Sequence, residues 1–525
     1  MQKRESVLES LNSPWDAIII GGGITGAGIL REAAGAGLRC LLLEQRDFAW
    51  GTSSRSGKLV HGGLRYLRQG QVKTTWHSVR QREKMLRDFE GLVEHLGFLL
   101  PTYRGGRFSP VMLQAGLAIY DLIALRRSRR RCSPEKIALL APALKAEGIN
   151  GCFWYRDART DDARLVLRVI SDGVRLGGAA LNYARVEDIL IKKSGRVRGV
   201  HLRDVLTGRS VEVRSQVVIN ATGAWAGNIR SPAGSRPRLR PLRGSHLVFP
   251  RWRFPLALAV NLIHPGDGRP LYVFPWEGVT LLGTTDLDHH HPLSEEPRIS
   301  PGEGQYLLDA VRHYFPSLDL TGNDALSTFS GVRPVVDTGK KDPSKESRDH
   351  AVWCDNGLIT VTGGKLTTFG LLAGEALAHA RKYLNSPAKP SAGDRKTGSC
   401  GLPAPEGVDG ASIKRLSGRY GPDAEEIIKC SLPGDLTTLP GTETLWAEIR
   451  WAAGQEGAAH LDDIMLRRTR LGILAPEGGA HILPRIREAV QPAAGWDDRR
   501  WEEEAGRYLD IWRNAYSPHL LKGTN

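Results

Sequence analysis

Apolar and polar positions at the start of the chain predict a β-α-β unit. Residues 17–20 are entirely apolar, glycines follow, a helical pattern runs from Thr25 to about Ala36, and residues 39–43 form a second, mostly apolar stretch. Strands with almost no polar positions are typical of a parallel sheet that is covered on both faces. We therefore expect the chain to begin with a parallel, doubly covered sheet.

The rest of the pattern predicts a mixed sheet and a separate helical tail. Residues 385–405 are rich in proline, serine and glycine, which is typical of a linker, and the tail beyond them has a helical pattern. Helical patterns also cover 71–96, 110–125, 164–176 and 366–384. Strand patterns follow Gly177-Gly178 and run to about residue 222. They recur at 245–249, 257–263, 271–274, 279–283 and 358–362.

Composition places the chain among folded proteins and gives it an excess of positive charge. Of the 525 residues, 41% are hydrophobic and 25% are charged, which argues against disorder. At roughly 150 residues per domain, the length predicts two to four domains. Lys and Arg outnumber Asp and Glu by 72 to 57, a net charge of +15. This favours an anionic partner: a phosphorylated substrate, a lipid headgroup surface or nucleic acid.

Cysteine spacing and the lack of long apolar stretches predict a cytoplasmic protein. The six cysteines show no CxxC spacing, which favours free thiols in a reducing compartment. The N-terminal residues lack the apolar core of a signal peptide. No stretch reaches the roughly 18 uncharged apolar residues that a membrane span needs.

A glycine-rich turn between the first predicted strand and helix predicts a dinucleotide site. Gly21, Gly23 and Gly26 form a G-x-G-x-x-G motif. A side chain at the first glycine would block the tight turn, and one at the second would hold the backbone away from a pyrophosphate. The free N–H groups of the helix N-terminus attract that anion. Glu44 ends the second predicted strand, where an acid can accept hydrogen bonds from ribose hydroxyls. The motif alone does not separate NAD from FAD.

Further motifs follow in order along the chain. They are Gly51-Thr52-Ser53-Ser54, Lys58 to Leu67 (KLVHGGLRYL), Asp161 to Leu165 (DDARL), Asn220 to Trp225 (NATGAW), Gly244-Ser245-His246, Gly283 to Asp286 (GTTD), Ser330 to Pro334 (SGVRP) and Gly363 to Thr368 (GGKLTT). With these motifs the chain resembles the FAD-dependent, quinone-linked glycerol-3-phosphate dehydrogenase family, part of the D-amino-acid-oxidase-like flavoprotein group, from about residue 15 to 370. One departure stands out: after GGKLTT the family commonly continues Tyr-Arg, whereas this chain has Phe369-Gly370.

The resemblance implies FAD as the cofactor and an α/β fold in three parts. These are a Rossmann-like FAD-binding domain, a mixed-sheet substrate cap domain and a C-terminal all-helical domain. The oxidoreductase core would span 15–388, and a linker with the helical domain would span 389–525. Within the core, the FAD-binding segments would be about 15–95, 155–235 and 325–388, and the cap segments about 96–154 and 236–324.

By the same resemblance, FAD would lie along several of these motifs. The glycine-rich turn and Glu44 would hold the adenosine half, and Gly364, Leu366 and Thr367 would meet the isoalloxazine end, where a helix N-terminus can face the flavin. The full set of expected cofactor-binding residues is Gly21, Gly23, Ile24, Thr25, Gly26, Glu44, Thr52, Ser53, Lys58, His61, Gly62, Gly63, Gly223, Gly364, Leu366 and Thr367.

Glycerol 3-phosphate, the implied substrate, is a small dianion that needs cations around it. The resemblance assigns Arg65 and Arg333 to its phosphate and Tyr66 to the pocket wall; structural salt bridges are the alternative role for both arginines. Oxidation moves a hydride from C2 to flavin N5 while the hydroxyl proton leaves, so a base or proton relay helps. His246 is the candidate, either as that base or as a group that only positions substrate. Lys365 would orient the hydroxyl or place positive charge beside the flavin.

An apolar segment followed by arginines predicts contact with a membrane surface. Residues 110–125 are apolar except for Gln114 and Asp121, and Arg126–Arg131 contains five arginines. Such a pairing lets a helix lie among anionic lipid headgroups. A buried helix followed by a solvated loop is the alternative. Because the implied acceptor, quinone, dissolves in lipid, we expect peripheral association with the inner face of the cytoplasmic membrane. A homodimer is left open.

The predicted function is oxidation of sn-glycerol 3-phosphate to dihydroxyacetone phosphate, with electrons passed from FAD to membrane quinone. The alternatives are an oxidase that uses O2, a related enzyme for another small hydroxy or amino acid, and an FAD-containing binding protein with nucleic acid as its partner. Cations and a histidine in the family motifs argue against the last, so no nucleic-acid partner is expected. No metal is expected either, because the consecutive histidines His289–His291 point in different directions.

Overall fold

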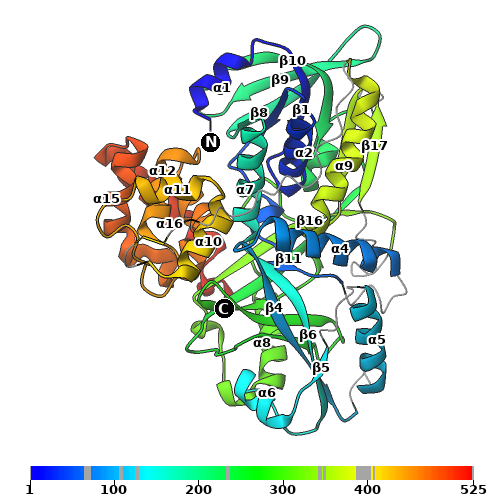
Figure 1. Cartoon of the computed structure of the whole chain (residues 1–525), viewed down its shortest axis with the longest axis vertical. Helices are drawn as coiled ribbons and strands as arrows, with labels where there is room; N and C mark the ends of the chain where they lie inside the picture. The colour runs from blue at the N-terminus through cyan, green and yellow to red at the C-terminus, as the bar shows by residue number, and fades with distance from the viewer. Residues whose placement is uncertain are drawn as a thin grey trace.

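Two β-sheets and a group of helices make up the computed structural model of the chain (Figure 1). The first sheet lies at the top of the view, the second sheet lies below it, and the helices of the C-terminal region lie to the left. The structure describes residues 2–63, 72–105, 110–123, 129–231, 234, 237–340, 346, 350–385, 402, 404–405 and 408–522.

The first sheet is parallel at its centre and contains the apolar strands near the N-terminus. In spatial order its strands are β17 (Ala351–Asp355), β18 (Leu358–Thr362), β10 (Ser210–Asn220), β1 (Trp15–Ile20), β2 (Cys40–Leu43) and β7 (Ala179–Leu181). The antiparallel strands β8 (Ala184–Ile191) and β9 (Val197–Asp204) adjoin β10. β1 runs parallel to β2 and β10, and Ala17, Ile18 and Ile19 are fully buried. The parallel, doubly covered sheet predicted from the sequence is confirmed.

Three helices pack together beside this sheet: α2 (Ile24–Gly35), α7 (Asp162–Arg175) and α9 (Phe369–Ala380). Glycine permits their close approach, because a Cβ at Gly28 would lie 2.7 Å from the Phe369 ring. The predicted helix 366–384 starts as the 3-10 turn η6 (Leu366–Thr368) and ends as η7 (Arg381–Tyr383). Strands and helices together enclose one apolar core.

The second sheet is mixed and contains the strands predicted between 245 and 283. In spatial order its strands are β15 (Leu287–Asp288), β11 (Leu239–Pro250), β14 (Val279–Gly283), β13 (Pro270–Trp276), β12 (Ala259–Ile263), β4 (Val93–Tyr103), β6 (Ile149–Thr160) and β3 (Leu59–Val60). Two further strands join it: β16 (Ser327–Val336) pairs with β11, and β5 (Arg130–Arg131) pairs with β6. The helices beside this sheet are α5 (Pro110–Ile123), α6 (Pro134–Leu140) and α8 (Pro301–Tyr314). β16 thus belongs to the second sheet, although it falls in a segment predicted for the FAD-binding domain.

The helix predicted for residues 71–96 is wrong beyond Asp88. α4 (Val72–Asp88) ends early, and β4 begins at Val93. Gly91 turns the chain with φ +84°, a conformation that glycine adopts without steric cost. The apolar residues beyond it pair with β6 over the length of β4. Tertiary pairing with a distant strand, which local periodicity does not report, decides the conformation here.

The C-terminal region is helical, as predicted. It comprises α10 (Gly410–Tyr420), α11 (Asp423–Lys429), α12 (Trp446–Gln455), α13 (Leu461–Asp463), the π-turn η8 (Ile464–Arg468), α14 (Leu471–Leu474), α15 (Leu483–Ala494) and α16 (Asp498–Ala515). Buried ion pairs attach it to the first part of the chain: Arg467 and Arg468 both contact Asp47, and Arg470 donates to the Ser54 carbonyl (2.6 Å). Among the described residues, no helix has the length and apolar character needed to cross a bilayer.

Candidate active site

The turn from β1 into α2 leaves no room for side chains. Gly21 has φ +109°, and a Cβ there would lie 2.6 Å from the Ala221 carbonyl oxygen. A Cβ at Gly26 would lie only 1.9 Å from the Gly21 carbonyl oxygen, so this glycine lets the helix begin directly against the turn. Gly23 is the N-cap of α2, and the next residue, Ile24, donates its N–H to Ser53 Oγ (3.0 Å). The first turn of α2 contains no acidic residue that would repel an anion, and the N–H groups of a helix N-terminus attract anions.

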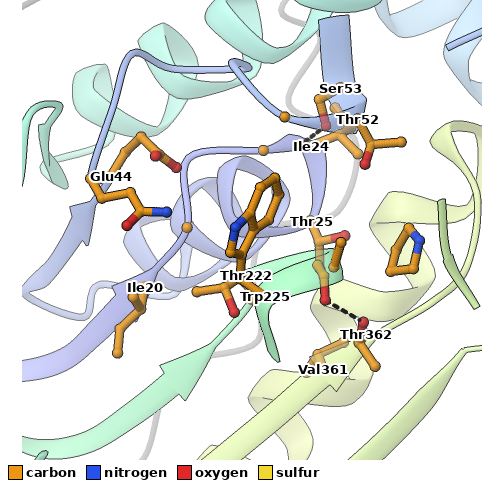
Figure 2. A pocket seen from close by; sticks show the side chains of 18 of the residues that line it. Ile20, Ile24, Thr25, Glu44, Thr52, Ser53, Thr222, Trp225, Val361 and Thr362 are labelled. Atoms are coloured by element: carbon orange, nitrogen blue, oxygen red, sulfur yellow. Dashed lines mark hydrogen bonds between the residues drawn. The ribbon is translucent and has the colours of Figure 1, made fainter. Parts of the chain in front are cut away.

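A long cavity, the first cavity, begins at this turn (Figure 2). Glu44 lies at one end, where its two carboxylate oxygens accept the N–H groups of Gly22 (2.7 Å) and Arg46 (2.9 Å). Burial, only partly offset by these two hydrogen bonds, raises the pKa of Glu44 above its usual value. The expected cofactor-binding residues that line this cavity are Gly21, Gly23, Ile24, Thr25, Glu44, Thr52, Ser53, Gly223, Gly364 and Leu366.

The far wall of the first cavity comes from strand ends that are distant in sequence. The turn η2 (Gly223–Asn228) follows β10, and Gly223 has φ +60°. Its carbonyl accepts a hydrogen bond from Thr362 Oγ1 (3.0 Å), which ties η2 to the end of β18 (Figure 2). Trp225, on the same turn, also lines the cavity, and its ring lies 6.0 Å from that of Trp50. The cavity therefore lies at the carboxyl ends of the parallel strands, where open α/β sheets bind ligands.

A second cavity adjoins the first and is lined mainly by the second sheet. The two cavities share a wall made of Thr52, Ser56, Pro334, Gly364, Lys365 and Leu366. His246, Arg333 and Lys365, which the sequence assigned to the substrate, all line the second cavity. So do His61, Gly63 and Thr367, which were expected at the cofactor. Residues predicted to bind the cofactor and residues predicted to bind the substrate thus line two cavities that share one wall.

His246 is buried with a neutral imidazole. Its ring stacks on Phe329 with centroids 4.5 Å apart, and a Cβ at Gly283 would lie 2.1 Å from its Cδ2. Burial, together with the positive charges of Lys58 and Arg333, holds the pKa of His246 well below its usual value. Nδ1 is shielded from solvent and has no hydrogen-bond partner among the described residues. A neutral ring at pH 7 is able to accept a proton.

Arg333 lies on β16 and is positioned by the loop that follows β14. Its Nη1 donates to Asp286 Oδ1 (2.9 Å) and to the Thr285 carbonyl (3.3 Å), and its Nη2 donates to Thr284 Oγ1 (3.1 Å). Its side chain is 22% exposed, so the ion pair with Asp286 does not close it off from the cavity. The Arg333 guanidinium therefore forms a salt bridge and also lines the second cavity.

Two of the expected cofactor-binding residues, Lys58 and Gly62, line neither cavity. Lys58 is fully buried, and its Nζ donates to both Asp162 oxygens (2.8 Å each) and to the Ser54 carbonyl (2.7 Å). Its side chain points into the junction with the C-terminal helices and lines neither cavity. Gly62 donates its N–H to Asp157 (3.0 Å) and packs against Tyr120, also away from both cavities.

Three further residues expected at the site are not among the described residues that line either cavity. Gly26 serves helix packing and does not line a cavity. Arg65 and Tyr66 lie outside the described residues. His289, part of the histidine tract, is buried, and no group of three or more metal-ligating side chains occurs in the described ranges.

Sequence reasoning missed several residues of the site. Arg269 and Asp286 line the second cavity, and Arg269 Nη1 donates to the Asp286 carbonyl (3.1 Å). Trp50 and the start of β8, residues 184–187, line the first cavity. Asp286 belongs to the GTTD motif, so the sequence contained a signal that could have identified it. Arg269 stands in a turn between β12 and β13 and has no motif around it.

A dinucleotide fits the first cavity by its donor groups and its lack of side chains. The N–H groups at the start of α2 suit a pyrophosphate. A Cβ at Gly23 would lie 3.1 Å from Ser53 Oγ, and both residues line the first cavity. Glu44 at the end of β2 suits a ribose. The residues present therefore match the needs of an adenine dinucleotide such as FAD.

Comparisons with known proteins agree with this geometry. A family profile described as FAD dependent oxidoreductase matches residues 16–380, and a second, described as the C-terminal domain of alpha-glycerophosphate oxidase, matches residues 369–501. The aerobic glycerol-3-phosphate dehydrogenase of Bacillus subtilis (strain 168) is 37% identical over 423 residues, which is 79% of this chain and 75% of that protein. The enzyme of the same name from Staphylococcus aureus (strain MRSA252) is 33% identical over 495 residues, 89% of each chain.

A solved structure resembles the whole chain. The glycerol-3-phosphate dehydrogenase from Bacillus halodurans, complexed with FAD, matches with a TM-score of 0.77 and 26% identity. The match covers 99% of this chain and 98% of that one, and so includes the C-terminal helices.

Proposed function

Because this chain belongs to the family of FAD-dependent oxidoreductases that includes the aerobic glycerol-3-phosphate dehydrogenases, we propose that it oxidises sn-glycerol 3-phosphate to dihydroxyacetone phosphate and passes the electrons to a membrane quinone. The observation that carries the proposal is the second cavity, which places cations and a neutral histidine across one wall from a dinucleotide cavity.

The first cavity would hold FAD. The start of α2, with Gly21 and Gly23, would bind the pyrophosphate, and Glu44 would bind the ribose. The turn η6 would face the flavin end through Leu366. FAD, when bound, accepts the hydride that leaves C2 of the alcohol.

The second cavity would bind the phosphorylated alcohol through its cations. Arg333 and Arg269 both line it, and each presents a planar guanidinium suited to phosphate oxygens. Lys365 lies on the wall between the two cavities, where its ammonium would orient the C2 hydroxyl. Asp286 and the Thr284 hydroxyl hold the Arg333 guanidinium in place before a dianion binds.

His246 would take the proton from the C2 hydroxyl at Nε2. Its other nitrogen is shielded, and its ring is fixed between Phe329 and Gly283, so Nε2 is the atom left to face the substrate. The low pKa keeps the imidazole neutral before substrate arrives. Departure of the hydroxyl proton assists loss of hydride from the same carbon, and the buried setting excludes water from competing for that proton.

We expect Arg333→Ala to weaken substrate binding while leaving FAD bound. Losing one charge-assisted contact costs roughly 1.5–3 kcal/mol, which corresponds to an approximately 10- to 150-fold higher half-saturating concentration of glycerol 3-phosphate. Asp286 would also lose its partner and repel the phosphate. Steady-state kinetics and the flavin absorbance of the purified variant measure both effects.

Arg253→Ala is the matched control for this prediction. Arg253 also pairs with an aspartate, Asp324 (2.7 Å), and with a backbone carbonyl, but it lines neither cavity. The control should keep its substrate affinity. Loss of flavin from Arg333→Ala would show that the assignment of this arginine to the substrate is wrong.

Quinone is the proposed acceptor, and O2 is the alternative. Relatives named dehydrogenases support the former, whereas the match of residues 369–501 to a domain named for an oxidase supports the latter. The experiment compares peroxide yield with reduction of a quinone analogue, both with glycerol 3-phosphate as substrate. The proposal predicts rapid reduction of the analogue with little peroxide; stoichiometric peroxide would favour the oxidase.

A membrane surface is the proposed docking partner of α5. One face of this helix packs inward through Leu117 and Tyr120, while Val111 and Leu122 on the other face are 77% and 74% exposed. Arg130 and Arg131 follow as exposed cations, while residues 124–128 lie outside the described part of the chain. Apolar side chains beside cations suit an anionic lipid surface.

We expect liposomes that contain anionic lipid to sediment the protein at low salt, and salt to release it. The measurement is co-sedimentation with anionic and with neutral liposomes. Replacing Val111 and Leu122 by serine should reduce binding. Equal binding to neutral liposomes, or no binding to either kind, would contradict the prediction.

A further inference from the structure

Glu303, in the first turn of α8, is a buried carboxylate that lines neither cavity but receives an unusual number of hydrogen bonds. Its Oε2 accepts from the Ser300 N–H (3.0 Å), the Ser300 hydroxyl (2.9 Å) and Arg243 Nη2 (2.7 Å). Its Oε1 accepts from the hydroxyls of Ser245 and Thr285 (2.8 Å each) and from Arg243 Nε (3.3 Å). Only 2% of the residue is exposed.

Capping of α8 accounts for only two of these six contacts, those from Ser300. The bonds between Ser300 and Glu303 Oε2 form a capping box, the usual pairing at a helix start. A second capping box nearby shows what such a box needs: Asp324 accepts from Thr321 and pairs with Arg253 (2.7 Å). Asp324 has no counterpart of the two hydroxyl bonds at Glu303 Oε1, so those bonds serve something other than the helix.

The Oε1 bonds lead to the groups of the second cavity. Ser245 directly precedes His246 on β11, and its N–H donates to Thr285 Oγ1 (2.9 Å). The Thr285 carbonyl accepts from Arg333 Nη1 (3.3 Å). Ser245 Oγ also hydrogen-bonds with Ser330 Oγ (2.7 Å), three residues before Arg333 on β16. One carboxylate oxygen therefore joins β11, the loop after β14 and, through Ser245, β16.

Glu303 stays ionised in this setting. Burial by itself would raise the pKa of Glu303, but Arg243 and the hydrogen bonds from Ser300 and Thr285 outweigh it and hold the pKa below its usual value. An ionised carboxylate accepts from every direction, so both hydroxyls can donate to the same oxygen. A glutamine has the same shape but a single acceptor atom. The three donors at one of the two oxygen positions would then face its amide N–H2 and lose their acceptor.

We propose that Glu303 is a positioning residue for the second cavity: through Ser245 and Thr285 it sets the relative placement of His246 and Arg333. The inference rests on the proposed function of that cavity. His246 acts on the C2 hydroxyl and Arg333 on the phosphate of the same substrate. A shift of the Thr285 loop, whose carbonyl holds Arg333, against β11 therefore misplaces one group relative to the other. Glu303 itself does not touch the substrate.

The test is Glu303→Gln in the FAD-loaded protein, followed by anaerobic stopped-flow bleaching at 450 nm with glycerol 3-phosphate. A misplacement of about 1 Å costs on the order of 100-fold in rate, so we expect the limiting rate to fall by that factor. We expect the half-saturating concentration to rise about tenfold, because the contact of Arg333 is weakened but not lost. Flavin content should equal that of the wild type. Thr285→Val removes one Oε1 bond and the acceptor of the Ser245 N–H. It should also lower the limiting rate, and it serves as the test if Glu303→Gln does not fold.

Ser300→Ala is the matched control, because it removes a hydroxyl from the Oε2 side of the same carboxylate. It should lower the melting temperature and leave both kinetic constants unchanged, as should Asp324→Asn in the other capping box. The proposal is overturned if Glu303→Gln or Thr285→Val keeps wild-type constants, or if Ser300→Ala loses as much rate as they do. A wild-type flavin that glycerol 3-phosphate does not bleach would instead overturn the proposed function, and this inference with it.

Discussion

Gly23→Val is expected to yield a protein that purifies without yellow colour. A valine side chain at this N-cap would begin with a Cβ 3.1 Å from Ser53 Oγ and extend into the cavity from there. It would hold a pyrophosphate off the N–H groups of α2, and those groups are the main anion site that the turn offers. We expect loss of nearly all flavin absorbance at 450 nm and, as a consequence, of all activity.

Gly506→Val provides the control for this substitution. Gly506 lies on the exposed face of α16, where a Cβ would meet nothing within 4 Å. This variant should purify yellow and active. If Gly23→Val also retained flavin, the cofactor would have to bind elsewhere, and the assignment of the first cavity would be wrong. Circular dichroism of both variants separates loss of the cofactor from loss of the fold.

We expect His246→Gln to retain flavin but to react slowly. Losing a general base costs about 10²- to 10⁴-fold in rate, and we expect the limiting rate of flavin bleaching to fall within that range. The control is His264→Gln. His264 is a buried histidine directly after β12. It also stacks on an aromatic ring, that of Tyr306 (3.7 Å between centroids), but it does not line the second cavity. If His246→Gln reacted as fast as the wild type, His246 would not be the base of the reaction.

The pH dependence of the wild type checks the same role by a different route. The active form of a base is the unprotonated one, so the rate falls as pH drops through its pKa. Because burial and the neighbouring cations hold the pKa of His246 well below its usual value, kcat/KM should be level across the neutral range and decline only in more acidic solution. A decline centred near pH 6.5, the ordinary histidine pKa, would contradict a buried neutral base.

The dinucleotide turn could be predicted because its requirements are local. Gly21, Gly23 and Glu44 lie within one β-α-β unit, and each is demanded by backbone geometry or by a strand end that the sequence pattern already reveals. The structure places all three on the first cavity. The parallel sheet and its helices followed from the same local pattern.

The second cavity could be predicted only through the family motifs. His246 and Arg333 stand on β11 and β16, which pair over most of their length although they are far apart in sequence. No periodicity reports such a pairing. Arg269 lies in a turn without a motif, and Glu303 has the sequence of an ordinary capping box, so neither had a signal that marked it as part of the site or of its support.

Lys58 shows why residue type within a motif does not fix a role. The family resemblance placed this residue along the cofactor. Its side chain instead forms an ion pair with Asp162, which Arg470 of the C-terminal region also contacts (3.0 Å). A buried carboxylate needs a partner, and the second cation beside Asp162, Arg470, comes 308 residues later in the chain. Only the assembled fold shows which way such a side chain turns.

The most direct test of the account is the flavin spectrum of the purified protein, recorded without oxygen before and after addition of glycerol 3-phosphate. Two adjoining cavities with these residues predict a bound flavin that absorbs near 450 nm and loses that absorbance when the phosphate ester is added. Glycerol without the phosphate should act only at far higher concentration, because it lacks the charge that the arginines bind. A spectrum that the ester leaves unchanged would contradict the account.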